Sequence, residues 1–208
     1  MLTRRQLLSM ALPALVVRAA WAENSAGIQT QYGIPRKAWV SAPPVIRQEC
    51  PQWCWAASMA MIFARHGRVV DQKTIVDSTF GGLMCASAPD TLTIASGLSR
   101  SWVDANGQPF SSTVTSAYDP ANNIVNLNNL MIIDELSNNR PLLYCNRHHA
   151  MVLVVLDYMD TRMGPSPYAA AVLDPWPGSP DWHYLSPGEF TPVHLGGEMT
   201  FLASVDIQ

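Results

Sequence analysis

Residues 48–57 read Gln-Glu-Cys-Pro-Gln-Trp-Cys-Trp-Ala-Ala and place a cysteine at the start of an apolar run with helical spacing. The apolar positions that recur at intervals of three and four are Trp55, Met59, Ile62 and Phe63. His66-Gly67 supplies a C-terminal stop, so Cys54 falls in the first turn of the predicted helix. There the helix dipole and unpaired N–H groups lower the pKa of a thiol and favour nucleophilic attack. We take Cys54 as the candidate nucleophile; the alternative is a cysteine that only packs the core.

The first 22 residues have the parts of an export signal. Arg4 and Arg5 form a basic start, and residues 7–17 form an apolar stretch that is short for a membrane span. Ala20-Trp21-Ala22 matches a cleavage site for removal of the leader. The arginine pair resembles the twin-arginine export motif, although the general secretory route remains open. We expect a periplasmic or secreted protein with no stable membrane anchor after cleavage.

Length and composition favour one domain after the leader. The chain has 208 residues, without an internal repeat or a low-complexity block. We expect an export signal in residues 1–22, an extended N-terminal arm in residues 23–45 and a single domain in residues 46–208. Loss of the leader removes three of the 13 Lys and Arg residues and none of the 16 Asp and Glu residues, which leaves a formal charge of −6. Nucleic acid is therefore excluded as an expected partner.

Four cysteines in an exported chain predict a disulfide. Cys50 with Cys85 is the preferred pair, because both lie in loop-like sequence around the first helices. Cys85 with Cys145 remains open on sequence grounds. A bridge between Cys50 and Cys54 would block the thiol of Cys54, and it is therefore the direct alternative to a nucleophilic Cys54.

The remaining pattern predicts helices first and strands after them. Helices are expected over residues 71–80 and 89–98 and from Asn128 or Asn129 through Leu136, a hairpin turn at Asn106-Gly107, and strands over residues 142–145, 150–156 and 168–173. This order is typical of an α+β domain with a mainly antiparallel sheet in its C-terminal half.

His149 stands at the mouth of the predicted strand over residues 150–156, and Asp174 follows the strand over residues 168–173. If these strands form a hairpin centred near Arg162, cross-strand partners have numbers that add to about 323, which sets His149 opposite Asp174. Directly opposed residues have Cβ atoms about 5 Å apart, within reach of a hydrogen bond. Asp174 would then orient His149, and His149 would deprotonate Cys54 and later protonate the leaving group.

These residues also have other interpretations. Asp174-Pro175 is a common start of a turn. His148 is a rival base, but as the neighbour of His149 it would point to the opposite face of a strand. Cys145 with His148 and His149 could hold a metal, yet no second ligand cluster is evident, so we expect neither a metal nor a cofactor. A set of aromatic residues flanks the site and could contact substrate or pack in the core: Trp53, Trp55 and Trp176.

Gln48-x5-Cys54-Trp55, His149-Ala150 before an apolar strand, and Asp174 after the next strand resemble the papain-like cysteine peptidases, most of all the compact exported bacterial members. The resemblance implies a helical N-terminal half whose nucleophile helix packs against a C-terminal antiparallel sheet. It also implies that Gln48 supplies a side-chain donor to the oxyanion hole, with Gln52 as the competing donor. The substrate would be a peptide or a protein, and a cognate inhibitor or immunity protein is a further expected partner.

The chain departs from papain in several respects. Cys50 lies four residues before Cys54, where papain spaces the corresponding cysteines three apart, and Asp174 replaces an asparagine. The same three catalytic groups could also carry out acyl transfer, deamidation or cell-wall amidolysis, because a shared acyl-enzyme step does not define the acceptor. An alternative of another class is a catalytically inactive papain-like binding module, in which Cys54 would be oxidised or buried.

Overall fold

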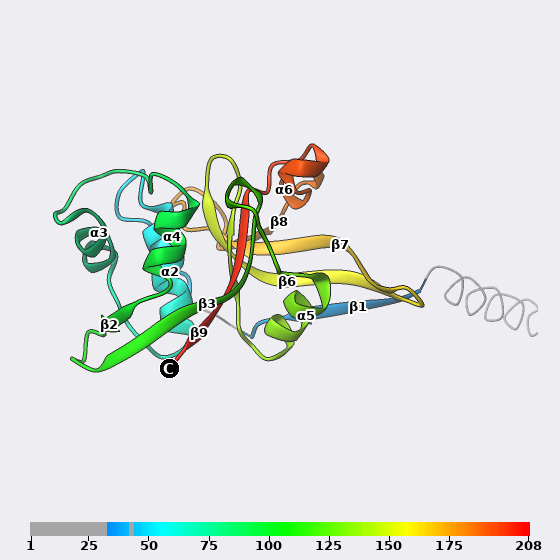
Figure 1. Cartoon of the computed structure of the whole chain (residues 1–208), viewed down its shortest axis with the longest axis horizontal. Helices are drawn as coiled ribbons and strands as arrows, with labels where there is room; N and C mark the ends of the chain where they lie inside the picture. Colours follow the sequence, from blue (N-terminus) through cyan, green and yellow to red (C-terminus); the bar gives the residue numbers. More distant parts are fainter. Residues whose placement is uncertain (1–32, 42–43) are drawn as a thin grey trace, which may run out of the picture.

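The computed structural model describes residues 33–41 and 44–208 (Figure 1). The predicted leader and the first part of the predicted arm, through residue 32, lie outside the described residues. The described part of the arm contains strand β1 (Ile34–Trp39), which pairs antiparallel with β6 (Ala150–Thr161). The chain ahead of residue 46 thus contributes a strand to the main sheet. No helix in residues 33–41 and 44–208 is long and apolar enough to cross a membrane.

Three helices gather at one end of the molecule: α2 (Cys54–Arg65), α3 (Gln72–Phe80) and α4 (Thr91–Gly97) (Figure 1). Side-chain caps fix where the shorter two begin. Asp71 accepts a hydrogen bond from the Thr74 N–H at the start of α3, and Asp90 accepts one from the Thr93 N–H at the start of α4. The helix predicted over residues 89–98 therefore begins two residues later than its pattern suggested.

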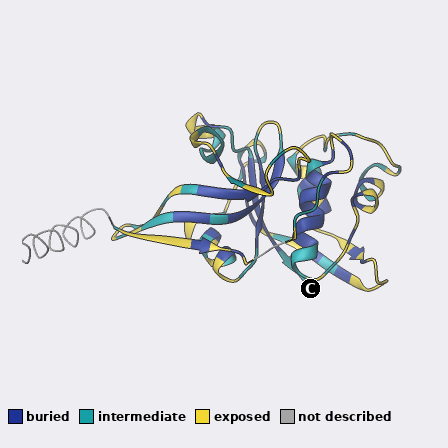
Figure 2. Ribbon diagram, turned by 180° about the vertical axis from the view of Figure 1, so that it is seen from behind, coloured by how far each residue is buried: buried dark blue, intermediate teal, exposed yellow. Residues whose placement is uncertain are grey.

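Helix α2, which begins at the candidate nucleophile Cys54, is the centre of this half. All residues from Trp55 to Phe63 are buried, so this part of the helix is enclosed on every side (Figure 2). It lies against α3 on one side and against β5 and β6 on another. A helix surrounded in this way holds its first residue in a fixed position relative to the sheet.

The sheet is antiparallel throughout the described residues, with the strand order β2-β3-β9-β5-β6-β7-β8, β1 beside β6 and β4 beside β3. Its other strands are β2 (Ser101–Val103), β3 (Pro109–Asp119), β4 (Ile124–Val125), β5 (Leu142–Cys145), β7 (Gly164–Leu173), β8 (Trp182–Tyr184) and β9 (Phe201–Ile207). The short helical elements are η1 (Pro120–Asn122), α5 (Asn129–Ser137), α6 (Pro187–Phe190) and η2 (Val193–Leu195). The protein is thus an α+β domain with an antiparallel sheet, as predicted.

Two local signals of the sequence are confirmed. The turn at Asn106-Gly107 joins β2 to β3, and Gly107 adopts a φ of 75° there. Asn128 caps α5 by accepting a hydrogen bond from the Met131 N–H.

The register of the β6–β7 hairpin differs from the prediction. Thr161 pairs with Gly164 around a two-residue turn, and Val152 pairs with Leu173 at the far end. The continuation of this register sets Asp174 across from Met151 and not from His149, a displacement of two residues. Because side chains alternate between faces with a period of two, this displacement leaves His149 and Asp174 on one face.

The predicted disulfide is present between Cys50 and Cys85, whose Cα atoms are 5.9 Å apart. Cys54 is free and half-buried, and Cys145 is free and buried. The two competing pairings, Cys85 with Cys145 and Cys50 with Cys54, are therefore wrong for this structure.

Candidate active site

Cys54 is the first residue of α2, and its position leaves the thiol close to unpaired backbone donors. The preceding residue, Trp53, does not cap the helix with its side chain, and the first turn carries no acidic residue. The Trp53 N–H instead bonds the Cys50 carbonyl and closes a turn before the helix. The start of α2 therefore presents its positive end to the Cys54 sulfur.

His149 lies at the end of the loop that joins β5 to β6. Asn146 closes this loop: its Oδ1 accepts hydrogen bonds from the N–H groups of His148 (2.9 Å) and His149 (2.7 Å). The His149 Nε2 lies 2.7 Å from Asp174 Oδ1. Since Nε2 is used by Asp174, Nδ1 is the ring nitrogen left to act on Cys54.

The Asp174 carboxylate is buried and has further neighbours. Its Oδ1 also accepts a hydrogen bond from the Trp176 N–H at 2.8 Å. Its Oδ2 lies 3.9 Å from His183 Nδ1 on β8. The carboxylate is 7% exposed at the side chain, so its charge is balanced by the groups that surround it and little by water.

The pKa values of the three residues move in directions that favour a thiolate–imidazolium pair. Burial raises the pKa of the Cys54 thiol, but the His149 side chain and the Ala150 and Trp55 N–H groups outweigh it and hold this pKa below its ordinary 9.0. Burial lowers the pKa of His149, yet the Asp174 carboxylate and Cys54 raise it to about 9. Burial acts against ionisation of Asp174, but the bonds from His149 and Trp176 bring its pKa to about 2.

Cys145 provides a contrast within the same chain. It is buried on β5, and this burial raises the pKa of its thiol well above the ordinary value. The two free cysteines therefore differ in chemistry: Cys54 is half-buried and the pKa of its thiol is lowered, whereas Cys145 is enclosed and the pKa of its thiol is raised. His148 is exposed, and among the described residues no cluster of three His, Cys, Asp or Glu side chains could hold a metal ion.

The two candidate oxyanion donors have different surroundings. Gln48 is 5% exposed, and its Nε2 donates to the carbonyls of Cys50 (3.0 Å) and Pro51 (2.9 Å), while its buried Oε1 has no partner. Gln52 is exposed, and its Oε1 accepts a hydrogen bond from the Ser87 hydroxyl at 2.9 Å. Gln48 is thus the more rigid donor, but in this structure it serves the loop that leads into α2.

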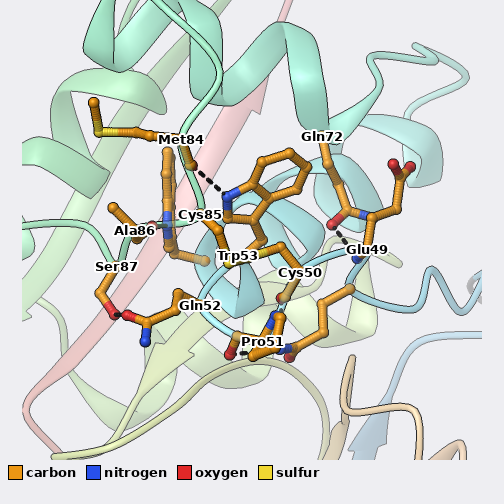
Figure 3. Close-up of a disulfide and its surroundings, with 12 residues drawn as sticks. Glu49, Cys50, Pro51, Gln52, Trp53, Gln72, Met84, Cys85, Ala86 and Ser87 are labelled. Atoms are coloured by element: carbon orange, nitrogen blue, oxygen red, sulfur yellow. Dashed lines mark hydrogen bonds between the residues drawn. A yellow bond between two sulfur atoms is a disulfide. The ribbon is translucent and has the colours of Figure 1, made fainter.

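Two of the three aromatic candidates are core residues. Trp53 is 7% exposed, and its indole N–H donates to the Met84 carbonyl (Figure 3). Trp55 is 2% exposed, and its indole N–H donates to the Ala86 carbonyl. The structure therefore places both in the packing beneath the site and not in a substrate cleft. Trp176 is 46% exposed and remains available to a substrate.

The same contacts fix the loop over residues 84–87 against the start of α2. These two segments are joined by the Cys50–Cys85 disulfide, the Trp53 indole hydrogen bond and the Ser87–Gln52 hydrogen bond (Figure 3), and also by the Trp55 indole hydrogen bond. The disulfide is part of the scaffold that positions Cys54.

Three residues beside the catalytic candidates were not predicted: Arg47, Asn146 and His183. Arg47 and His183 contact residues that are distant in sequence, and Asn146 bonds backbone N–H groups. No local sequence motif predicts such contacts. Strand β8 brings His183 to the Asp174 carboxylate. No protein-family model and no curated protein matches this chain.

Proposed function

We propose that the protein is an exported, papain-like thiol hydrolase that cleaves peptide or amide bonds through a thioacyl intermediate on Cys54. The observation that carries the proposal is the 2.7 Å contact between His149 Nε2 and Asp174 Oδ1, which leaves His149 Nδ1 for the free, half-buried Cys54. A nucleophile, a base and an orienting carboxylate arranged in this order form the general plan of a catalytic triad.

In the first half of the reaction, the Cys54 thiolate attacks the scissile carbonyl carbon and forms a C–S bond, and the carbonyl π electrons move to oxygen. The His149 imidazolium then gives its Nδ1 proton to the leaving amine as the C–N bond breaks. In the second half, neutral His149 takes a proton from a water molecule, and the water oxygen attacks the thioester carbon. The C–S bond then breaks, which releases the acid and restores the Cys54 thiolate. Asp174 accepts the Nε2 hydrogen bond throughout and stabilises the imidazolium.

The developing oxyanion needs donors near the start of α2. The Cys54 backbone N–H, free at the helix N-terminus, is one such group. Gln48 would supply the second donor when one N–H of its Nε2 turns from a loop carbonyl to the substrate oxygen. Hydrogen bonds of resting sites often change partners when substrate binds, so the loop contacts of Gln48 are compatible with this role.

A papain-like arrangement is supported by the placement of the nucleophile on the central helix and of the base on the sheet that this helix contacts. Export is supported by the disulfide, which persists in oxidising compartments, and by the leader pattern of residues 1–22. A peptide or protein is the proposed substrate, and a cognate inhibitor or immunity protein is a proposed partner.

The binding-module alternative expects Cys54 to be oxidised or buried. Cys54 is free and half-buried, and Cys50 is bonded to Cys85, so the enzyme is favoured. Acyl transfer, deamidation and cell-wall amidolysis use the same first step and differ only in bond and acceptor.

The proposal is tested by incubating the mature, disulfide-intact protein with a complex peptide mixture and identifying products by mass spectrometry. We expect new peptide termini with the wild type and with C145A, and none with C54A. Deamidated or acyl-transferred products that require Cys54 would support the alternative reactions of the same site. Equal cleavage by C54A would refute the mechanism.

A further inference from the structure

Arg47 precedes Gln48, and its guanidinium reaches the loop that follows β7. Its Nη1 donates to the carbonyl oxygens of Asp174 and Trp176, both at 2.8 Å. Its Nη2 donates to the carbonyl oxygen of Ser179 at 3.1 Å and to the Asp181 carboxylate. The four terminal N–H groups of one side chain are thereby directed to four acceptors in a single loop.

The backbone around Arg47 is itself fixed from the helical side. The buried side chain of Gln72 on α3 donates from Nε2 to the Arg47 carbonyl (2.8 Å) and accepts from the Glu49 N–H (3.1 Å). The Gln48 N–H also bonds the carbonyl of Pro175 at 2.9 Å. A continuous set of hydrogen bonds therefore runs from α3, through residues 47–49, to the loop that carries Asp174.

This loop runs from Asp174 to Asp181 and contains Pro175, Pro177 and Gly178. Its own hydrogen bonds join the Asp174 N–H to the Asp181 carbonyl (3.2 Å), the Ser179 N–H to the Trp176 carbonyl (3.1 Å) and the Trp176 N–H to Asp174 Oδ1 (2.8 Å). Asp174 lies one residue beyond the end of β7, so its backbone is no longer held by pairing with β6. The Arg47 contact to the Asp174 carbonyl takes the place of that pairing.

We propose that Arg47 is a positioning residue that holds the Asp174 carboxylate on His149 and thereby extends the pH range of the thiolate–imidazolium pair. The inference rests on the proposed function, since it assigns Arg47 a task in that site. Arg47 acts through the backbone of Asp174 and touches no reacting atom.

The charged and titratable groups around Asp174 come from four elements. His149 faces its Oδ1 from the start of β6, and His183 faces its Oδ2 from β8. Arg47 contacts its carbonyl from the segment before α2, and Asp181 closes the loop and bonds Arg47. Cys54 faces His149 on the other side. A shift of the Asp174 carboxylate away from His149 would therefore remove one of the two groups that raise the pKa of His149, leave Cys54 as the other, and lower that pKa.

The test is the pH dependence of Cys54 alkylation by iodoacetate, which requires no known substrate. An anionic reagent reacts fastest with a thiolate beside an imidazolium, so its rate falls on the alkaline side as His149 loses its proton. In R47M and R47K we expect this alkaline midpoint to move down by about one pH unit, which is about a tenfold loss of rate on that limb. Lysine keeps the charge but cannot span three carbonyls from one nitrogen.

R140M is the matched control. The side chains of Arg140 and Arg47 are both 33% exposed, but Arg140 bonds carboxylates of α5, Asp134 and Glu135, and contacts no part of the site. Its alkaline midpoint should equal that of the wild type. H183Q tests whether His183 contributes to the shift of the alkaline midpoint. R47M in the H183Q background should show the same shift as R47M alone.

A folded R47M or R47K protein with the alkaline midpoint of the wild type would overturn the inference. If R47M does not fold, R47K alone decides. A wild-type Cys54 that reacts as an ordinary thiol, with no alkaline limb, would refute the proposed function itself. A normal wild-type profile with unchanged Arg47 variants would refute only the role of Arg47.

Discussion

His149 Nε2 and Asp174 Oδ1 are 2.7 Å apart, although neither residue belongs to a strand: His149 precedes β6 and Asp174 follows β7. Their contact is diagonal across the open end of the hairpin, because the register sets Asp174 across from Met151. Diagonal neighbours on one face of an antiparallel pair are farther apart than opposed residues, and long side chains close the gap. The contact therefore depends on an even displacement along the strands and on the loops at both ends.

We predict that H149A reduces kcat/KM on the order of 1000-fold, because it removes the side chain proposed to exchange protons with Cys54 and the leaving group. D174A should cost less, about 10- to 100-fold, since the imidazole remains beside the thiol without its orienting partner. Cleavage of a peptide identified in the product analysis provides the measurement. A loss in D174A that equals or exceeds the loss in H149A would contradict these roles.

The stability of the fold should depend on Asp174 in acid. Its folded-state pKa of about 2 lies below the ordinary 3.8, so it contributes stability that is present above pH 3.8 and lost as the pH falls toward 2. This contribution is about 2 kcal/mol, and D174N lacks its pH dependence. Urea unfolding at steps between pH 5 and pH 2 should show a steeper decline for the wild type than for D174N. Parallel declines would mean that the Asp174 carboxylate is not held in its charged form.

Substitution of Gln48 and of Gln52 shows which of the two side chains donates to the oxyanion. Q48A should lower kcat about 100-fold by removing a donor to the oxyanion, and Q52A should change it by less than about fivefold. Q48A also leaves the Cys50 and Pro51 carbonyls without their side-chain partner, at a cost of about 1 to 3 kcal/mol in the free energy of unfolding. Steady-state kinetics of both variants measure the loss of kcat, and urea unfolding measures the loss of stability separately. A larger kcat loss in Q52A would transfer the oxyanion role to Gln52.

Removal of the disulfide should destabilise the fold strongly. Cys50 and Cys85 are 35 residues apart, and closure of a loop of that length is worth about 4 kcal/mol in the chain-entropy treatment. The double variant C50A/C85A avoids a new free thiol that could exchange with Cys54. We expect its urea midpoint to fall while the indole hydrogen bonds of Trp53 and Trp55 keep the 84–87 loop near α2. An unchanged midpoint would mean that these side-chain contacts suffice.

Much of the site could be predicted because its signals are local. The start of α2 follows from the apolar spacing after Pro51, and the face shared by His149 and Asp174 follows from the two-residue period of strands. The register error came from the position of the hairpin centre: the prediction put it near Arg162, with partner numbers adding to about 323, whereas the turn between Thr161 and Gly164 makes them add to 325. β7 begins at Gly164, ahead of the strand predicted over residues 168–173, and includes Pro165 and Pro167. Proline is tolerated there because β8 pairs only with Ala171–Leu173, so the first part of β7 is an edge.

The positions that the sequence did not reveal depend on distant partners. Arg47 meets its carbonyl acceptors more than a hundred residues later in the chain, and His183 reaches Asp174 only through the pairing of β8. Trp53 and Trp55 flank the nucleophile in sequence, but helical geometry turns both into the packing against the 84–87 loop. Proximity in sequence to Cys54 was a poor guide to proximity to substrate.

The proposed mechanism requires that Cys54 is an activated thiolate and that His149 activates it. The most direct measurement is peptide mass spectrometry of the mature, non-reduced protein after brief treatment with a thiol-directed epoxide at mildly acidic pH, where an ordinary thiol reacts slowly. The account predicts selective labelling of Cys54, little labelling of Cys145, and loss of Cys54 labelling in H149A. A Cys54 found in a disulfide, or one that reacts no faster than the thiols of the denatured chain, would contradict it.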